Sequence, residues 1–463
     1  MNSTNRGTSY DAIVIGSGQG GTPLSLYLAD QGLETALIEK QHVGGTCVNV
    51  GCTPTKTMIA SARVAHLAGR AKDYGVKTGK TGVELSEVRK RKRKVVKSFR
   101  KGNLNQIKEK PGLDLIRGEA SFTAPYTLEV TKDDGGEQTK EGEKIFIDTG
   151  ARPSAPPIKG LDEVKYLDST SIMELGEVPD KLLIIGGGYV GVEFAQAFRR
   201  FGSKVIIFQR SSQLLTHEGE DVAQAVKEIL EEDGIVVELN KEAQRVEKVP
   251  EGVRVVTDGS SEEVASHLMV AAGRAPNTDS LGLENTDVKA TKRGHIEVND
   301  KLETDQENVY ALGDVKGGPA FTHISYDDFR VLRDNLFEDG DRTIKDRLIP
   351  YTVFIDPQLG RVGLTEKEAR EKGYDVRVVT MPMDRVARAL EVDETRGMMK
   401  VVVDGETERI LGAAILGIEG GEIASAIQIA MMGDLSYKEL KEGVFAHPTL
   451  AESLNNLFSS LES

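Results

Sequence analysis

Hydrophobic and polar positions follow the same order in two separate stretches of the chain. Residues 11–15, DAIVI, form an apolar run of strand type, the helical stretch TPLSLYLADQ follows, and residues 35–39, TALIE, form a second strand. Residues 181–210, KLLIIGGGYVGVEFAQAFRRFGSKVIIFQR, repeat this order of strand, helix and strand. Short apolar runs that alternate with helical patterns are typical of βαβ units. The pattern therefore predicts two such units in one chain.

Each unit carries glycines between its first strand and its helix. Both sets have the spacing G-x-G-x-x-G, and they are Gly16, Gly18 and Gly21, then Gly186, Gly188 and Gly191. In a dinucleotide-binding unit the first glycine permits a tight turn, the second lets the backbone approach a pyrophosphate, and the third lets the helix pack on the strand. One match of this kind is weak evidence, whereas a duplicated unit is specific. We therefore expect two cofactors, a flavin dinucleotide and a nicotinamide dinucleotide.

The residue that ends the second strand differs between the two units. Glu39 lies 23 residues after Gly16, and Gln209 lies 23 residues after Gly186. A carboxylate at this position binds ribose hydroxyls and would repel a 2′-phosphate, whereas Gln209 with the adjacent Arg210 would tolerate or bind one. The second site therefore favours NADPH.

Composition limits the size and the partners of the fold. A chain of 463 residues is too long for one ordinary core, so about three domains are expected. A net charge of -14 argues against nucleic acid as a partner. The first ten residues lack an apolar core, and no apolar run is long enough to span a bilayer. We expect a cytoplasmic protein with no membrane partner.

The two cysteines of the chain, Cys47 and Cys52, lie in the stretch GGTCVNVGCTPTK. A lone free cysteine is most often a small buried hydrophobe, but the neighbours here are polar and rich in glycine. A structural zinc site would need two further ligands, and none of the seven histidines stands at metal-ligand spacing. In a reducing compartment a close pair of this kind favours a redox-active dithiol, and we expect no metal ligands.

A helix is predicted directly after the second cysteine. The stretch TPTKTMIASARVAHLAGRA offers Thr53 as a cap, Pro54 in the first turn, and alanine and leucine at helical spacing. Cys52 would then lie against a helix N-terminus, whose partial positive charge favours a thiolate.

Two dinucleotide units with a C-x4-C pair just beyond the first resemble the flavoprotein disulfide reductases, the group that contains dihydrolipoamide dehydrogenase, glutathione reductase and mercuric reductase. The resemblance covers nearly the whole chain. It implies an α/β fold with two Rossmann-like dinucleotide-binding domains and a C-terminal α+β dimerisation domain, with FAD and NAD(P)H as cofactors. The implied boundaries are 1–155 and 279–348 for the FAD domain, 156–278 for the NAD(P) domain and 349–463 for the dimerisation domain.

The resemblance also assigns roles to residues around the cysteine pair. It implies that Cys47 attacks the substrate and that Cys52 makes a charge-transfer contact with the flavin. Lys56 matches a lysine beside flavin N5, and Glu193, in GGGYVGVEF, matches the glutamate that pairs with it. Asp314, in ALGDV, matches the aspartate that reaches the ribityl chain, and TGARP and AAGRAPN match the two crossovers between the dinucleotide domains. The remaining cofactor contacts implied in this way are Gly45, Thr46, Thr149, Gly150 and Gly273.

The stretch FAHPTLAESLNNLF near the C-terminus resembles the His-Pro-Thr signature of the family. The resemblance makes His447 a general acid/base and Glu452 the residue that orients it. An imidazole that titrates near neutrality suits proton delivery to a leaving sulfur. In the family this histidine lies opposite the disulfide of the other subunit, so a homodimer with shared active sites is implied.

The resemblance limits the substrate to a few classes and leaves open which of them the protein uses. TCVNVGCTPTK, SYDDFR and YTVFIDPQLGRVG are most similar to proteins grouped with mercuric reductase, yet the chain ends LFSSLES without the cysteine pair that mercuric reductases carry there. His447 instead suits dithiols and disulfides. We expect NAD(P)H-dependent reduction of a disulfide or of a thiol-bound soft metal ion, with dihydrolipoamide dehydrogenase acting toward NAD+ as the alternative.

Two polar stretches are interpreted as structure rather than as binding sites. VRKRKRKVVKSFRK, residues 88–101, predicts a helix with a solvated basic face and a buried stripe of Val88, Val95, Val96 and Phe99. Residues 133–144, DDGGEQTKEGEK, predict a polar hairpin or loop.

Overall fold

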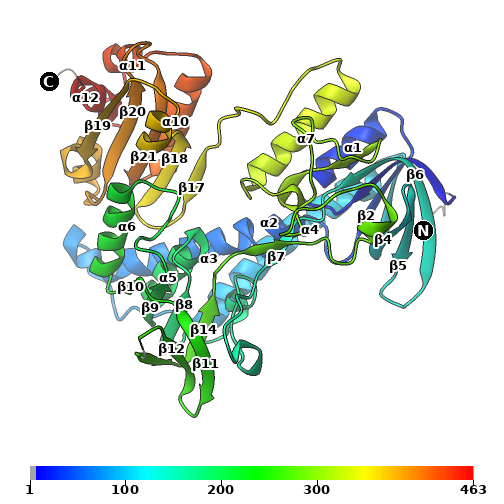
Figure 1. Cartoon of the computed structure of the whole chain (residues 1–463). Helices are drawn as coiled ribbons and strands as arrows, with labels where there is room; N and C mark the ends of the chain where they lie inside the picture. The colour runs from blue at the N-terminus through cyan, green and yellow to red at the C-terminus, as the bar shows by residue number, and fades with distance from the viewer. Residues whose placement is uncertain (1–6, 260, 462–463) are drawn as a thin grey trace. The chain divides into compact units, whose positions relative to one another are not determined.

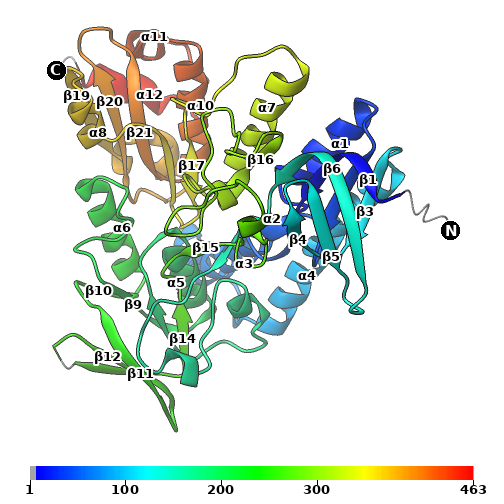
Figure 2. The same ribbon diagram turned by 45° about the vertical axis from the view of Figure 1, so that its right-hand side comes forward.

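The computed structural model describes residues 7–259 and 261–461, and the chain divides into two compact units. The first consists of Met1–Thr57, Lys90–Ser154 and Gly273–Arg347, and the second of Met58–Arg89, Ala155–Ala272 and Leu348–Ser463. Figures 1 and 2 show the elements of both, and each unit is described by itself. Part of the N-terminal stretch expected to lack a targeting segment, residues 1–6, lies outside the described residues.

The first unit is built on one sheet with the strand order β3-β2-β1-β6-β5-β4, and β16 also pairs with β6. Strands β1, β2, β3, β6 and β16 form parallel pairs, and β4, β5 and β6 form an antiparallel meander. The turn between β5 and β6 confirms the predicted polar hairpin. The bounds are β1 Ser9–Ile15, β2 Thr35–Glu39, β3 Leu113–Arg117, β4 Glu119–Ala124, β5 Thr127–Thr131, β6 Glu137–Ile147 and β16 Val309–Ala311.

Alternation along β1 supplies both faces of this sheet with core residues. Ala12 and Val14 pack in one cluster with residues of α1 (Gly21–Asp30) and α7 (Thr322–Phe337), and Ile13 and Ile15 pack in a second cluster on the other face. The short strands β7 (Ala151–Pro153) and β15 (Arg274–Pro276) pair antiparallel in the same unit.

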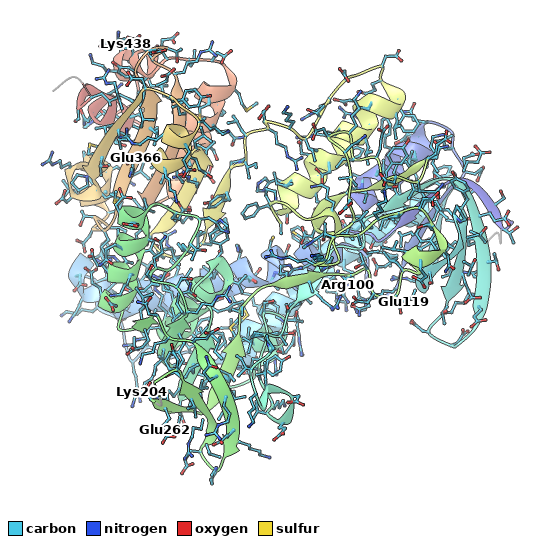
Figure 3. All side chains as sticks on the ribbon, viewed as in Figure 1. Arg100, Glu119, Lys204, Glu262, Glu366 and Lys438 are labelled. Atoms are coloured by element: carbon cyan, nitrogen blue, oxygen red, sulfur yellow. The ribbon has the colours of Figure 1, made fainter. Side chains whose placement is uncertain are left out.

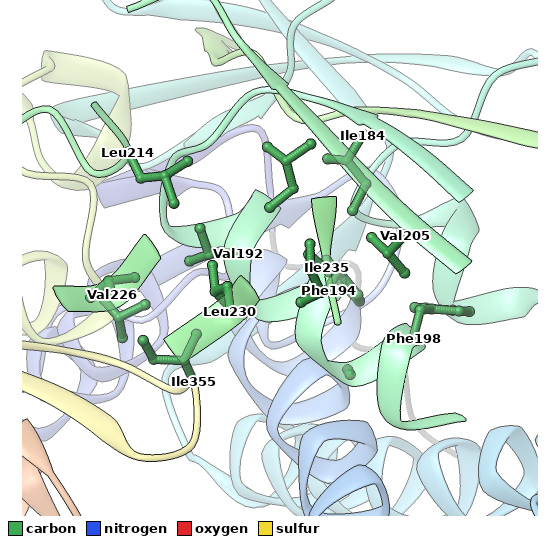
Figure 4. Packing of buried hydrophobic residues seen from close by; sticks show 14 of the residues in the cluster. Ile184, Val192, Phe194, Phe198, Val205, Leu214, Val226, Leu230, Ile235 and Ile355 are labelled. Carbon is green, nitrogen blue, oxygen red and sulfur yellow. The ribbon is translucent and has the colours of Figure 1, made fainter. Parts of the chain in front are cut away.

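The second unit contains a repeat of the same βαβ pattern. Its parallel sheet has the order β10-β9-β8-β14, and α5 follows the glycine turn after β8. Large apolar side chains from β8, α5, β9 and α6 pack together, including Ile184, Phe194, Val205 and Leu230 (Figure 4). The bounds are β8 Lys181–Ile185, α5 Tyr189–Phe201, β9 Lys204–Gln209, α6 Glu220–Glu232, β10 Val236–Leu239 and β14 His267–Val270. A separate antiparallel sheet contains β11 Ala243–Val249, β12 Gly252–Thr257 and β13 Glu262–Ala265. Figure 3 shows charged side chains of this unit, among them the exposed Lys204 and Glu262.

The C-terminal part of the second unit is an antiparallel sheet with helices. Its strand order is β17-β18-β21-β20-β19, and residues of α10 and α12 pack in a core cluster with this sheet. The strand bounds are β17 Tyr351–Val353, β18 Gln358–Gly363, β19 Val376–Pro382, β20 Met398–Asp404 and β21 Ile410–Gly417. The helices are α8 Glu366–Glu371, α9 Ala387–Glu391, α10 Gly420–Met432, α11 Tyr437–Glu442 and α12 Ser453–Ser459. The architecture is the predicted one, with two Rossmann-like parts and a C-terminal α+β part.

Two helices follow the predicted local patterns with two differences, and a third, α2, was not predicted. α2 spans Gly45–Asn49, and α3 spans Cys52–Gly69, so α3 begins one residue before Thr53, the residue predicted to cap it. α4 spans Leu85–Glu109 and contains the basic stretch. Val96 is buried as predicted, but Phe99 is 54% exposed, so its assignment to the buried stripe was wrong. Helical periodicity predicts the direction in which a side chain points. Whether that side chain is buried also depends on whether a neighbouring element covers that part of the helix.

Candidate functional site

Both cysteines carry thiol groups and lie in the first unit, one in α2 and the other at the start of α3. Cys47 is half-buried in the short helix α2, and Cys52 is the exposed first residue of α3. Between them, a Cβ atom on Gly51 would lie 2.9 Å from the carbonyl oxygen of Thr46, so the chain can approach this closely only at glycine. The predicted position of Cys52 at a helix N-terminus is confirmed, and this position favours its thiolate.

Charge in the dithiol is divided unequally between the two sulfur atoms. The pKa of Cys47 is raised by its hydrogen bond to Cys52, by burial and by the charge of Cys52, while Thr322 and Lys56 act in the opposite direction. Cys47 therefore keeps its proton when Cys52 is a thiolate. Such coupled groups titrate as a pair.

Thr322 contacts this pair and was missed by the sequence analysis. Its Oγ1 atom lies 3.1 Å from Sγ of Cys52, and Thr322 is the first residue of α7. The two residues are 270 positions apart, so no local spacing could indicate the contact.

The glycines of the first unit form a cradle that has no room for side chains. A Cβ atom on Gly16 would lie 2.3 Å from the carbonyl oxygen of Asp148, and one on Gly21 would lie 2.1 Å from the carbonyl oxygen of Gly16. At the end of β2, the carboxylate of Glu39 accepts hydrogen bonds from Ser17 N at 3.1 Å and Ser17 Oγ at 2.5 Å. The glycine turn and the acid are thus tied together, as in dinucleotide-binding βαβ units. Gly45 also approaches this cradle, since its Cβ atom would lie 2.7 Å from Cα of Gly18.

Buried polar groups lie beside the cradle. The carboxyl group of Asp148 accepts a hydrogen bond from Gly21 N at 2.7 Å, and burial raises its pKa well above the usual value. Oγ1 of Thr149 is buried and has no hydrogen-bond partner among the described residues. Burial also raises the pKa of Asp314, which Arg274 partly offsets at 3.7 Å. An unpaired buried hydroxyl and a cradle without side chains fit a bound dinucleotide, so this unit suits a flavin dinucleotide. Asp148 was also missed, because the sequence offers no reason for a carboxyl group at that position.

The second unit repeats the cradle with a neutral amide in place of the acid. A Cβ atom on Gly186 would lie 2.4 Å from the carbonyl oxygen of Ala271, and one on Gly191 would lie 2.0 Å from the carbonyl oxygen of Gly186. Gly187 N donates a hydrogen bond of 2.9 Å to Oε1 of Gln209, which is the relation that Ser17 N has to Glu39. No atom lies within 4 Å of a Cβ position on Gly188, so the turn is open at that point. This cradle suits a nicotinamide dinucleotide, and Arg210 beside it is exposed.

The remaining predicted residues fall in both units. Lys56, in α3, and the crossover residues Gly150 and Gly273 belong to the first unit. Glu193, in α5, is buried in the second, where its Oε1 accepts a hydrogen bond of 2.8 Å from Phe354 N. The pairing of Lys56 with Glu193 stays a prediction.

His447 and Glu452 lie side by side in the second unit. The two carboxylate oxygens of Glu452 lie 3.0 and 2.9 Å from Nδ1 of His447. Asn455, in α12, holds the end of α11, since its Nδ2 lies 2.8, 2.9 and 3.0 Å from the carbonyl oxygens of Leu440, Lys441 and Gly443. A carboxylate at Nδ1 fixes the proton on that nitrogen and leaves Nε2 available as a base. The side chain of His447 is 69% exposed, so an external group can reach it.

The described part of the chain offers neither a metal cluster nor a membrane-spanning helix. There, no group of three or more histidine, cysteine, aspartate or glutamate residues is arranged to hold a metal ion. No helix within residues 7–259 and 261–461 has the length and apolar character needed to cross a bilayer.

Known proteins are similar to this chain in sequence and fold over nearly all of its length. The family model "Pyridine nucleotide-disulphide oxidoreductase" matches residues 10–328, and the model of its dimerisation domain matches residues 349–458. The probable pyridine nucleotide-disulfide oxidoreductase RclA of Escherichia coli is 40% identical over 97% of this chain and 99% of its own. A mercuric reductase of Staphylococcus aureus is 35% identical over 97% of this chain and 82% of its own.

A dihydrolipoyl dehydrogenase of Thermus scotoductus is also 35% identical, over 96% of each chain. Among solved structures, a Cu(II) complex of the HOCl-induced flavoprotein disulfide reductase RclA from E. coli superposes with a TM-score of 0.90, at 38% identity and over 98% of this chain and 99% of its own. The chain thus belongs to the pyridine nucleotide-disulphide oxidoreductases, flavoproteins that act on sulfur groups and use FAD and NAD(P)H.

Proposed function

We propose that this enzyme uses NAD(P)H to reduce a disulfide, or a soft metal ion bound to thiols, through the Cys47–Cys52 pair. When bound, NAD(P)H and FAD supply the electron pair that converts the cysteine disulfide to a dithiol. The observation that carries the disulfide part of the proposal is the hydrogen bond between His447 and Glu452, because a proton-transfer group is of use in thiol exchange and not in binding a bare metal ion.

The division of charge in the dithiol explains why such a base is needed. The pKa of Cys47 is raised by its interaction with Cys52, so the sulfur that attacks the substrate starts as a thiol. We assign the uptake of this proton to Nε2 of His447, which belongs to the partner subunit in the proposed homodimer. Attack by the Cys47 thiolate forms a mixed disulfide and releases one substrate thiolate, which takes the proton from His447. Attack by the Cys52 thiolate on the Cys47 sulfur then releases the second substrate thiolate, which takes a proton from water, and restores the enzyme disulfide.

Soft metal ions are the second class of substrate within this proposal. The relatives include mercuric reductases, and two of the solved RclA structures are Cu(II) complexes. Two thiolates can bind such an ion, but the 463 residues contain no third cysteine to form a relay. Dihydrolipoamide dehydrogenase activity in the opposite direction remains the alternative, and the His447–Glu452 pair is equally suited to it.

The test is an anaerobic reduction of the purified FAD enzyme with one equivalent of NADPH or NADH. Two thiols per chain should appear, and alkylation with mass analysis should locate them at Cys47 and Cys52. Lipoamide, glutathione disulfide, Hg(II) and Cu(II) are then added separately, and the loss of thiols is followed.

Rapid loss with a disulfide, slowed about 100-fold or more by His447→Ala, supports disulfide reduction. If only a metal ion consumes the thiols, and His447→Ala has no effect, the metal is the substrate. If NAD(P)H generates no thiols in the enzyme, the proposal as a whole is contradicted.

A further inference from the structure

A series of hydrogen bonds starts at the second glycine turn and ends at the first residue of the helix that follows this turn. Gly187 N donates to Oε1 of Gln209 at 2.9 Å, Nε2 of Gln209 donates to the carbonyl oxygen of Gln213 at 3.2 Å, and Nε2 of Gln213 donates to the carbonyl oxygen of Glu218 at 3.1 Å. The carboxylate of Glu218 accepts a hydrogen bond from the hydroxyl of Tyr351.

The circuit closes through a second tyrosine. The hydroxyl of Tyr351 is hydrogen-bonded to that of Tyr189, and the two ring centroids are 5.2 Å apart. Tyr189 is only two positions beyond Gly187, where the circuit starts, and it is the first residue of α5. All of these residues belong to the second unit. We call this set the coenzyme circuit: Gly187, Gln209, Gln213, Glu218, Tyr351 and Tyr189.

The carboxylate in this circuit is buried with an imperfectly paired cation. The side chains of Glu218 and Arg361 are 0% and 5% exposed, and Oε2 of Glu218 lies 3.8 Å from Nη1 of Arg361. Oε2 of Glu218 and Nη2 of Arg361 have no hydrogen-bond partner among the described residues. Burial raises the pKa of Glu218, while Arg361 and Tyr351 oppose that change. A buried ion pair of this geometry contributes little to stability, so stability alone does not account for it.

The circuit joins the two sides of the coenzyme cradle. One side is the glycine turn and the first turn of α5, whose backbone N–H groups suit a pyrophosphate. The other side is the loop of residues 210–219, which follows Gln209 and begins with Arg210. The backbone fixes this loop to the turn at one point, where Leu215 N donates to the carbonyl oxygen of Gly187 at 2.9 Å. Side chains of the circuit add the second attachment, through Tyr351 of β17.

We propose that Glu218 and Tyr351 are positioning residues for the coenzyme. They hold Tyr189 and the 210–219 loop in the arrangement that NAD(P)H binds. Binding of the coenzyme therefore costs little conformational entropy in this loop. Glu218 and Tyr351 should serve NADH and NADPH alike, because the pyrophosphate at the glycine turn is common to both nucleotides. This role is independent of which substrate the cysteines reduce.

The test measures affinity for the coenzyme rather than turnover alone. Calorimetric titration of the oxidised full-length FAD enzyme with NADP+ and with NAD+ gives Kd for wild type, Tyr351→Phe and Glu218→Gln. Glu220→Gln, an exposed carboxylate just beyond the same loop, and Tyr374→Phe, an exposed tyrosine, are the matched controls. Tm and FAD content are measured for each variant, so that loss of folding is separated from loss of affinity.

We expect Tyr351→Phe to raise Kd about tenfold for both nucleotides, with the controls within about twofold of wild type. KM for the coenzyme should rise by a similar factor, and turnover at saturating coenzyme should fall less. Tyr189→Phe combined with Tyr351→Phe should raise Kd no further than the larger single effect, because both changes break one circuit.

Glu218→Gln keeps an oxygen acceptor for Tyr351 and removes the charge, so it should raise Kd less than a variant that breaks the circuit. Glu218→Ala removes the acceptor and tests the circuit if Tyr351→Phe does not fold. Unchanged Kd values in the folded variants, with a lowered Tm, would show a purely structural role and overturn the proposal. A rise in Kd for only one of the two nucleotides would also overturn it.

Discussion

Oγ1 of Thr322 lies 3.1 Å from Sγ of Cys52, and each of these residues is the first of its helix. The positive ends of α7 and α3 therefore meet at the sulfur of Cys52. A threonine hydroxyl can donate a hydrogen bond to a thiolate. The hydrogen bond to Cys52, burial and the charge of Cys52 raise the pKa of Cys47, and contact with Thr322 partly opposes that rise. Thr322 therefore helps to stabilise negative charge on the dithiol.

Replacement of this hydroxyl should make the dithiol harder to ionise. In Thr322→Val the side chain keeps its shape and loses its donor, so the first apparent pKa of the pair should rise by about one unit. Alkylation of the reduced enzyme by iodoacetamide at pH 7 should then slow about tenfold, with mass analysis assigning the modified cysteine. Thr322→Ser retains the hydroxyl and is the control. Equal alkylation rates in the valine variant and the wild type would show that the contact does not affect ionisation.

Glu452 should influence turnover through the orientation of His447. In Glu452→Gln the amide can still accept a hydrogen bond from Nδ1, but it carries no charge to stabilise an imidazolium. We expect turnover with a disulfide to fall about tenfold, with reduction of the enzyme by NAD(P)H unchanged.

The matched control for Glu452 is Glu442→Gln, whose carboxylate is exposed near the end of α11. The double variant of Glu452→Gln with His447→Ala should be no slower than His447→Ala alone, because the glutamate acts through the histidine. If the two variants lower turnover additively, Glu452 acts independently of His447.

Asp148 should make the enzyme less stable as pH rises. Burial raises the pKa of its carboxyl group above the unfolded value, so the folded chain binds the proton more tightly than the unfolded chain. Between the unfolded pKa and the raised folded pKa, each pH unit then lowers the free energy of unfolding by at most about 1.4 kcal/mol. Asp148→Asn keeps an acceptor for Gly21 N and removes this proton linkage.

The difference should appear in urea unfolding at pH 5 and pH 8 with saturating FAD. Asp148→Asn should gain stability relative to wild type at pH 8 and gain less at pH 5. Asp133→Asn, in the exposed turn between β5 and β6, should follow wild type at both values. The same pH dependence in wild type and Asp148→Asn would mean that this carboxyl group is not held protonated.

Local pattern predicted the fold and the cradle residues, while contacts between distant segments supplied the rest. The strand at residues 35–39 was predicted at its observed bounds, because an apolar run between two glycine-containing turns allows few alternatives. Thr322 and Asp148 were missed because the contacts that define them join residues 270 and 127 positions apart. Phe99 was misplaced because its helical phase matches the stripe, but the described part of the chain covers its side chain only in part, leaving it 54% exposed.

Arg210 should decide the preference between the two coenzymes. Oε1 of Gln209 accepts the hydrogen bond from Gly187 N at 2.9 Å, so the position that would bind ribose hydroxyls through a carboxylate is neutral here. Arg210 follows it directly and is exposed, and a guanidinium suits a 2′-phosphate. In Arg210→Gln, Kd for NADP+ should rise about tenfold, and Kd for NAD+ should stay within about twofold.

The effect should be specific to this position and should depend on charge. Lys248→Gln removes an exposed positive charge from β11 of the same unit and should leave both affinities unchanged. Because an exposed ion pair is screened by salt, the difference between Arg210→Gln and wild type should shrink at high ionic strength. Equal losses for both nucleotides would mean that Arg210 contacts the shared pyrophosphate or adenosine. If neither Kd changes in Arg210→Gln, residues outside the 210–219 loop determine the coenzyme preference.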